Sequence, residues 1–202
     1  MPSRPKIVLG THNAKKLVEL SKLLAPAEVD FCTLAEFPEA IEVVEDGRTF
    51  LDNARKKAVE QARRLRRWVL GEDSGLVVDA LDGQPGVYSA RFSGPEATDE
   101  SNNRLLLERL AGVPPRRRGA GYACQMVLAD PAGEPRAESH GACRGRILLE
   151  PRGTGGFGYD PLFEIIEYHR SFGELGPVAK GVLSHRARAA ARLLPHLDRL
   201  LR

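Results

Sequence analysis

The chain has few cysteines and no long apolar run, and each shortage excludes a class of protein. Its three cysteines, Cys32, Cys124 and Cys143, are widely spaced and form no C-x-x-C pair. Neither a disulfide framework nor a zinc cluster is therefore indicated. No stretch approaches the roughly 20 apolar residues of a transmembrane helix, and residues 1–6 lack the apolar segment of a signal peptide. We therefore expect a cytoplasmic protein with reduced thiols and no membrane attachment.

An excess of charge of one sign is also missing. The net charge of +3 is compatible with a small anionic ligand, but it is far from the dense basic surface of a dedicated nucleic-acid binder. The sequence lacks G-x-x-x-x-G-K-[ST], H-E-x-x-H and G-x-S-x-G, so P-loop, zincin and hydrolase-elbow mechanisms lose their usual signatures. With 42% apolar and 28% charged residues, the composition is typical of a soluble globular protein, and 202 residues suffice for one well-buried domain.

Two adjacent carboxylates, Glu72 and Asp73, stand between apolar segments at 68–70 and 76–78. The glycines on either side predict a tight turn at 71–75, at the end of a buried strand. Burying two carboxylates is costly unless a cation or strong donors meet them, so the pattern favours a divalent metal or a set of lysines. Alternatively, Asp73 only caps the backbone of its own turn.

The N-terminal segment predicts a strand at 7–9, a loop, and a helix at 14–24 that ends before Pro26. Thr11 in the loop is the candidate N-cap. The start of the helix points N–H groups and the positive end of the helix dipole at whatever lies above it, which favours an anion. A plain capped helix has the same pattern.

A second strand is expected at 41–44, followed by a turn and a long helix at 50–67. Asn53 and Lys57 lie one turn apart on this helix, beside a stripe of small apolar residues. We therefore expect these two side chains to face a cleft instead of bulk water.

The second half of the chain predicts a helix at 99–110, an antiparallel hairpin of strands at 122–129 and 137–149, and a C-terminal helix from Ser184 that Pro195 bends or interrupts. Helices that alternate with strands, followed by a hairpin, predict a mixed α/β sheet.

A glycine-rich loop at 153–161 is similar to a dinucleotide fingerprint in composition only, because Pro161 and an apolar strand follow where that motif needs a helix. Phe157 lies among these glycines and is either a plug packed on the sheet or a platform on which a flat ligand stacks. His185 and Arg186 open the C-terminal helix, as ordinary first-turn residues or as two donors that read a carbonyl-bearing ring.

Six short motifs occur in order along the chain and are more specific together than singly. They are Gly10-Thr11-His12-Asn13-Ala14-Lys15-Lys16, Glu45-Asp46-Gly47 with Thr49-Phe50 and Asn53-Ala54, Asp73-Ser74-Gly75-Leu76, Pro85-Gly86-Val87-Tyr88-Ser89-Ala90-Arg91, Gly155-Gly156-Phe157-Gly158-Tyr159-Asp160-Pro161, and Lys180 with Ser184-His185-Arg186. From about residue 6 to residue 200, this joint pattern closely resembles the inosine triphosphatase family.

The resemblance implies an α/β fold with an elongated mixed sheet, flanking helices and two lobes around a central cleft, in one domain over residues 1–202. It implies Mg²⁺-dependent hydrolysis of the noncanonical purine nucleotides dITP, ITP and XTP to the monophosphate and pyrophosphate. Such a reaction keeps deaminated purines out of DNA and RNA. The resemblance further implies a homodimer, and we expect no stable complex with nucleic acid.

The resemblance also implies roles for individual residues. Asp73 matches a metal-binding general base, Glu45 a further metal ligand, and Lys57 a lysine that reaches the phosphates. Ser74 matches a substrate contact next to Asp73. The predicted triphosphate loop comprises Thr11, His12, Asn13, Ala14, Lys15 and Lys16. The predicted purine site comprises Phe157, which stacks on the base, the loop residues Gly158, Tyr159 and Asp160, and the base-reading residues Lys180, His185 and Arg186.

Two residues depart from the family pattern. His12 stands where members often have Gly or Asn, so either the loop approaches the phosphates less closely or the imidazole itself contacts them. Glu72 stands where many members have a second Asp, which leaves its contact with the metal open.

Two other functions remain open on the sequence alone. A related pyrophosphatase of the septum-formation inhibitor type handles pyrimidine or modified nucleotides on a similar scaffold, but the group at 184–186 argues against it. A noncatalytic RNA-binding protein would use Phe157 and the arginine runs at 63–67 and 116–118. We instead expect those runs to be a solvated helix end and a loop.

Overall fold

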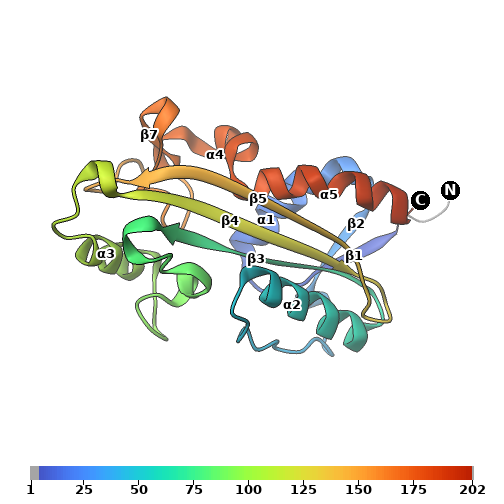
Figure 1. Cartoon of the computed structure of the whole chain (residues 1–202). Coiled ribbons are helices and arrows are strands. Elements are labelled where there is room, and N and C mark those ends of the chain that lie inside the picture. The colour runs from blue at the N-terminus through green and yellow to red at the C-terminus, as the bar shows by residue number, and fades with distance from the viewer. Residues whose placement is uncertain (1–4, 202) are drawn as a thin grey trace. The chain divides into compact units, whose positions relative to one another are not determined.

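The computed structural model describes residues 5–201 of the chain. It confirms the predicted α/β class, with a seven-stranded mixed sheet and flanking helices (Figure 1). The strands are β1 (Lys6–Leu9), β2 (Asp30–Thr33), β3 (Trp68–Val78), β4 (Gly119–Ala129), β5 (Pro135–Ile147), β6 (Phe163–Ile165) and β7 (Arg170–Ser171). The helices are α1 (Ala14–Leu24), α2 (Phe50–Leu65), α3 (Asp99–Arg109), α4 (Phe172–Leu183) and α5 (His185–Leu201). Within residues 5–201, no helix has both the length and the hydropathy to cross a membrane.

The sheet has the strand order β2-β1-β3-β4-β5-β6-β7. β1 pairs in parallel with β2 and with β3, so that Val8 lies opposite Cys32 on one side and Val69 on the other. β6 pairs antiparallel with β5 and with β7. The turn at 130–134 joins the neighbouring strands β4 and β5, and a connection this short requires antiparallel strands. The predicted hairpin is therefore confirmed.

The chain forms two compact units. Unit 1 comprises the described residues up to Asp73, Cys124–Gly141 and the described residues from Arg186 on. Unit 2 comprises Ser74–Ala123 and Ala142–His185. The strands β3, β4 and β5 therefore contribute residues to both units.

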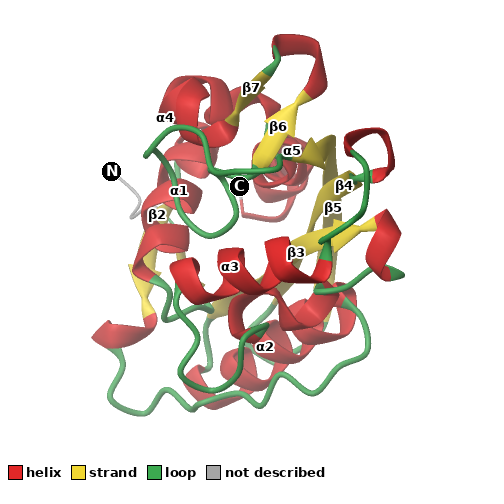
Figure 2. Ribbon diagram, turned by 90° about the vertical axis from the view of Figure 1, so that its left-hand side faces the viewer, coloured by secondary structure: helices red, strands yellow, loops and turns green. Residues whose placement is uncertain are grey.

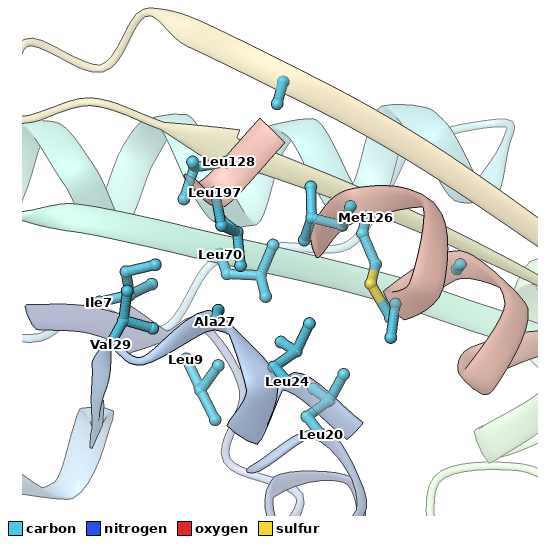
Figure 3. Packing of buried hydrophobic residues seen from close by; sticks show 14 of the residues in the cluster. Ile7, Leu9, Leu20, Leu24, Ala27, Val29, Leu70, Met126, Leu128 and Leu197 are labelled. Atoms are coloured by element: carbon cyan, nitrogen blue, oxygen red, sulfur yellow. The ribbon is translucent and has the colours of Figure 1, made fainter. Parts of the chain in front are cut away.

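Alternation along the strands builds unit 1 in three layers. Ile7 and Leu9 of β1 point toward α1 and α5, whereas Val8 points toward α2. Successive side chains of a strand point to opposite faces, so both faces of this part of the sheet are covered. The cluster on the α1 and α5 side includes Leu20, Leu24, Leu70, Met126, Leu128 and Leu197 (Figure 3). The cluster on the α2 side includes Ala54, Ala58, Ala62 and Leu65.

Unit 2 has a core of its own, built around three buried rings. The ring centroids of Tyr122 and Phe163 are 4.6 Å apart, and those of Phe163 and Phe172 are 5.6 Å apart. The strands β6 and β7 lie beside α4 (Figure 2). Gly176 has non-helical backbone angles (φ 76°, ψ 179°), so α4 is kinked at this residue.

Two expectations about single elements are wrong. The second strand lies at Asp30–Thr33, and residues 41–44 form no regular element. The backbone of Ile41 is instead held by the side chain of Gln61, which accepts from its N–H and donates to its carbonyl. The expected turn at 71–75 is also wrong, because β3 runs without a break through these residues. Helix α5 continues through Pro195, so this proline does not interrupt it.

Candidate active site

The strand β3 separates the two adjacent carboxylates, because successive side chains point to opposite faces of a sheet. Asp73 lies on the same face as Val69, which packs toward α2. Glu72 lies on the same face as Leu70, which packs toward α1 and α5. The two carboxylates therefore belong to two different clusters and do not act as one pair.

Gly71 lets α2 lie close to β3. A Cβ atom at this position would be 2.1 Å from the carbonyl oxygen of Ala54 and 2.7 Å from the backbone nitrogen of Ala58. Only glycine allows the helix backbone to pack this closely on the strand. The close packing brings Lys57 of α2 beside Asp73.

Lys57 bridges two carboxylates of unit 1. Its Nζ donates to Asp73 Oδ1 at 3.0 Å and to Glu45 Oε2 at 2.8 Å. Lys57 and Asp73 are buried, whereas Glu45, on the loop before α2, is half-buried. The structure thus brings together the three residues for which the family resemblance implies metal binding, base chemistry and phosphate contact.

Burial and charge act in opposite directions on this cluster. Burial raises the pKa of Asp73, and the charges of Lys57 and Lys16 offset this only in part. Burial also opposes ionisation of Glu45, but there the charge of Lys57 prevails and lowers the pKa. Burial disfavours the ammonium of Lys57, yet the two carboxylates outweigh it and raise the pKa of Lys57. Asp73 is therefore the more basic carboxylate, and Lys57 remains charged.

The donor set of this cluster suits a hard divalent cation. Two carboxylates face one ammonium, which leaves the cluster with a formal negative charge. Mg²⁺ is commonly held by one or two carboxylates, with waters and substrate phosphates as its other ligands. Among residues 5–201, no three or more His, Cys, Asp or Glu side chains converge into a metal cage. Glu45 and Asp73 therefore fit a metal that binds together with phosphates better than a closed structural site.

Glu72 is the centre of a second cluster in unit 1. It is 1% exposed, and its Oε2 lies 2.9 Å from Lys16 Nζ. Its Oε1 accepts from Nε and Nη2 of Arg186, both at 3.2 Å, and Arg186 also pairs with Glu19. Two carboxylates and two cations balance each other here. Glu72 therefore fixes Lys16 and lies on the opposite face of the strand from Asp73.

The predicted triphosphate loop lies at the start of α1. Asn13, and not Thr11, is the N-cap, because its Oδ1 accepts from the Lys16 N–H at 3.1 Å. Thr11 supports this cap, since its Oγ1 accepts from the Asn13 N–H at 3.1 Å. The loop thus presents polar groups at the positive end of the helix dipole. Its exposed members are His12, Asn13, Ala14 and Lys15.

Lys180 organises part of the predicted purine site in unit 2. Its Nζ donates to Asp160 Oδ2 at 2.6 Å and lies 4.1 Å from the centroid of the Phe157 ring. Asp160 Oδ2 also accepts from the Phe157 N–H at 2.8 Å. Gly156 has a φ of 79°, and a Cβ there would be 2.1 Å from Asp160 Oδ2, so this position requires glycine. The Phe157 ring is half-buried with a cation over one face, and it is not a fully buried plug.

Two hydrogen bonds join the loop at 153–161 to other segments of unit 2. The Tyr159 hydroxyl donates to the Ser89 carbonyl at 2.8 Å, and Asn103 Nδ2 donates to the Gly158 carbonyl at 2.9 Å. Burial raises the pKa of Tyr159, so this hydroxyl stays a donor at neutral pH. Tyr159 therefore supports the loop with its polar end.

His185 and Arg186 are adjacent in the sequence but belong to different units. The buried ring of His185 stacks on Tyr122, with centroids 4.7 Å apart and planes 10° apart. His185 is the last residue of unit 2, whereas Arg186 joins the Glu72 cluster of unit 1. Ser74 is half-buried and follows the general-base candidate on β3.

Comparison with known proteins identifies the family of this chain. A sequence profile of the Ham1 family matches residues 7–196. The chain belongs to the Ham1 family. The Ham1 assignment confirms the resemblance derived from the six motifs. A Ham1 relative from Rhodopirellula baltica, described as a dITP/XTP pyrophosphatase, is 56% identical over 195 residues, which are 96% of this chain and 94% of that protein.

Solved structures of Ham1 relatives support the fold. A HAM1 protein from Coxiella burnetii superimposes with a TM-score of 0.87 at 37% identity, over 96% of this chain and 99% of that chain. A protein from Mycobacterium abscessus, described as a nucleoside-triphosphatase and dITP/XTP pyrophosphatase, has a TM-score of 0.77 and 43% identity, over 94% and 99% of the two chains.

Three residues that complete the clusters of this Ham1 chain have no role assigned from the sequence, which predicts only that Asn53 faces a cleft beside Lys57: Asn53, Glu19 and Tyr122. Helical spacing was an available signal for the first two, because they lie one turn from Lys57 and Lys16 on predicted helices. Tyr122 carries no such signal, since the residue on which it stacks is distant in the sequence.

Proposed function

We propose that the chain is a Mg²⁺-dependent pyrophosphatase that hydrolyses dITP, ITP and XTP to the nucleoside monophosphate and pyrophosphate. The observation that carries the proposal is that Asp73 and Glu45 accept hydrogen bonds from one atom, Lys57 Nζ. A basic carboxylate, a second carboxylate and a cation are thereby assembled, as hydrolysis of a triphosphate requires. The descriptions of the two pyrophosphatase relatives name dITP and XTP, two of these three substrates.

Asp73 is the proposed general base. Attack at the α-phosphorus requires that a water molecule lose a proton, and a carboxylate whose pKa is raised by burial accepts that proton more readily near neutral pH. Glu45 and Asp73 are the residues that would hold Mg²⁺. When bound, this ion would neutralise negative charge on the triphosphate.

The start of α1 is the proposed triphosphate site. Its loop at residues 11–16 offers N–H groups and the ammonium of Lys16, which Glu72 holds in place at 2.9 Å. Lys57 would reach the phosphates from α2, and its contacts with Asp73 and Glu45 orient it for this role. Cations fixed before the substrate binds need little rearrangement during the reaction.

The residues around Phe157 are the proposed purine site. The half-buried ring offers a surface for stacking, and Lys180 and His185 supply donors for the 6-keto oxygen of hypoxanthine or xanthine. Adenine has an amino group at this position, which would leave buried donors unpaired. The guanidinium of Arg186 is held by Glu72 and Glu19, so we assign it first to fixing that cluster. Its part in reading the base stays a prediction.

The proposed reaction removes deaminated purine nucleotides before polymerases incorporate them. It therefore places the protein in the cytoplasm, with the free nucleotide pool, and requires no stable nucleic-acid complex. We further propose one domain across both units, because the family profile runs through residues 7–196. The homodimer that the family resemblance implies is tested by light scattering on the purified protein.

Pyrophosphate release from a panel of nucleotides tests the function. We expect dITP, ITP and XTP to be hydrolysed with Mg²⁺ and not with a chelator, and dATP to be a poor substrate. A clear preference for dTTP or UTP would favour an enzyme of the septum-formation inhibitor type. Tight, salt-sensitive RNA binding that survives Asp73→Asn would favour the RNA-binding alternative.

A further inference from the structure

Helix α2 presents two side chains to Asp73, and only one of them is the lysine that the family pattern assigns. Asn53 lies one turn before Lys57 and is fully buried. Its Nδ2 donates to Asp73 Oδ2 at 3.3 Å, whereas Lys57 donates to the other oxygen, Oδ1. Both oxygens of the proposed base therefore accept a hydrogen bond from α2.

The same side chain also holds the loop that carries Glu45. Asn53 Oδ1 accepts from the backbone N–H of Gly47 at 2.8 Å. A Cβ atom at residue 47 would be 2.5 Å from this oxygen, so Gly47 is needed for the contact. Residues 41–49 form no helix or strand, and their position depends on contacts of this kind.

The two contacts fix the orientation of the amide. The backbone N–H of Gly47 requires an acceptor, so the oxygen of Asn53 must face it and the NH₂ group must face Asp73. An aspartate at residue 53 would still accept the hydrogen bond from the Gly47 N–H, but it would place a carboxylate against the carboxylate of Asp73. Of these two side chains, only the amide serves both partners.

We infer that Asn53 is a positioning residue that fixes the carboxylate of Asp73 and, through Gly47, the loop bearing Glu45. The inference rests on the proposed function, because it assumes that these two carboxylates perform the chemistry. It predicts a larger effect of residue 53 on turnover than on substrate binding, since the proposed nucleotide contacts lie on other residues.

Gln61 provides a matched control on the same helix. It lies two turns after Asn53 and is 2% exposed. Its side-chain amide holds the same loop through the backbone of Ile41, but no contact joins it to either carboxylate. Asn53→Asp and Gln61→Glu therefore make the same chemical change in the same helix, and only the first change faces Asp73.

Steady-state kinetics with dITP and Mg²⁺, together with thermal unfolding, test the assignment. We expect Asn53→Asp to lower kcat by about 30- to 100-fold, the effect of a displaced reacting group, with KM within about threefold. Gln61→Glu should lower Tm but leave kcat within about threefold. Hydrogen exchange of the peptide at 42–50 should rise in Asn53→Ala and stay near wild type in Asn53→Asp, which keeps the acceptor for Gly47.

A kcat of Asn53→Asp equal to that of Gln61→Glu would overturn the assignment while leaving the proposed function intact. Unchanged hydrogen exchange in Asn53→Ala would equally contradict the contact with Gly47. If Asn53→Asp shows no cooperative unfolding, the smaller neutral variant Asn53→Ser decides by the same kcat criterion. A wild-type protein that releases no pyrophosphate from any nucleotide overturns the proposed function, and the assignment with it.

Discussion

Adjacent residues of one strand take different chemical roles in this protein. Burial raises the pKa of Asp73, whereas its neighbour Glu72 is held between Lys16 and Arg186 on the opposite face. The sequence predicts either a divalent metal or a set of lysines at these carboxylates, and the structure places a lysine beside each of them. It does not predict that each carboxylate has its own lysine. The flanking glycines suggest a turn, whereas the segment is a strand whose successive side chains point to opposite faces.

The first prediction concerns Asp73. Asp73→Asn should lower kcat for dITP by about 10²- to 10⁴-fold, because a general base and a metal ligand are lost together. Nucleotide binding should persist, because Lys16 and Lys57 remain, and calorimetry with a nonhydrolysable dITP analogue measures it. Asp46→Asn is the control, since Asp46 is an exposed carboxylate beside Glu45 that pairs only with Lys56 among the contacts described. Wild-type turnover in Asp73→Asn would show that Asp73 is not the general base.

The second prediction concerns base selection. His185→Ala should narrow the ratio of kcat/KM between dITP and dATP by about tenfold, because a donor that opposes the adenine amino group is lost. Arg186→Ala should narrow it as well if the guanidinium reads the base. Arg186→Ala also removes one of the two cations that pair with Glu72, and with it a partner of Glu19, with a cost of about 3–5 kcal/mol in the free energy of unfolding. An unchanged ratio in both variants would place base reading elsewhere.

Close packing of α2 on β3 is the element-scale feature on which the carboxylate cluster depends. The start of α2 follows from the sequence, because Thr49 and Asp52 form a capping box. The distance between helix and strand does not follow, because it depends on Gly71 meeting the backbone of Ala54 and Ala58. The local sequence shows a glycine at residue 71, but it does not show that α2 packs against this residue.

Gly71→Ala tests this packing. The added methyl group overlaps backbone atoms of α2, so we expect the free energy of unfolding to fall by about 1–3 kcal/mol and kcat for dITP to fall as the helix moves. Gly181→Ala in α4 is the control, because the structure has open space around that position. Chemical denaturation and dITP turnover measure the two effects. If Gly71→Ala behaves like Gly181→Ala, close packing does not place Lys57.

The position of the second strand shows a further limit of local patterns. Residues 41–44 are rich in β-branched residues, as strands are, yet the edge of β1 is taken by Asp30–Thr33, which follows α1 after a short connection. Which segment pairs with an edge depends on competition along the whole chain. Residues 41–44 pair with no strand, and the backbone N–H of Ile41 is instead bonded to the side chain of Gln61.

At the scale of the whole molecule, helices that alternate with strands predict the α/β class. The family resemblance implies two lobes, but local patterns do not show where the two units begin and end. The reason is that β3, β4 and β5 each contribute residues to both units, so no linker marks a boundary. The family profile likewise spans residues 7–196 without a break. The order of the seven strands was also beyond prediction, since it rests on pairings that are distant in the sequence.

The dependence of global stability on pH follows from Glu164. This buried carboxylate accepts from Arg146 and Arg152. Burial opposes its ionisation, but the two arginines prevail and lower its pKa from the ordinary value of 4.5. A lowered pKa in the folded state stabilises the protein above the unfolded-state pKa, and this contribution is lost as the pH falls through the folded-state pKa.

Glu164→Gln should therefore lower the free energy of unfolding by about 1.5–3 kcal/mol at pH 7, the value of charged hydrogen bonds. The difference from wild type should shrink as the pH falls below 4.5. Urea denaturation at several pH values measures it, with the exposed Glu167→Gln as control. A difference that stays constant down to pH 3 would show that the charge of Glu164 is not its cause.

The three cysteines have a consequence for the chemical durability of the protein. All three are buried and reduced, and burial raises the pKa of Cys32 and of Cys124. Alkylating agents and peroxides react with exposed thiolates, so the native fold shields its sulfur atoms from these reagents. The folded protein should therefore keep its three thiols under conditions that modify exposed cysteines, and should lose this protection when it unfolds.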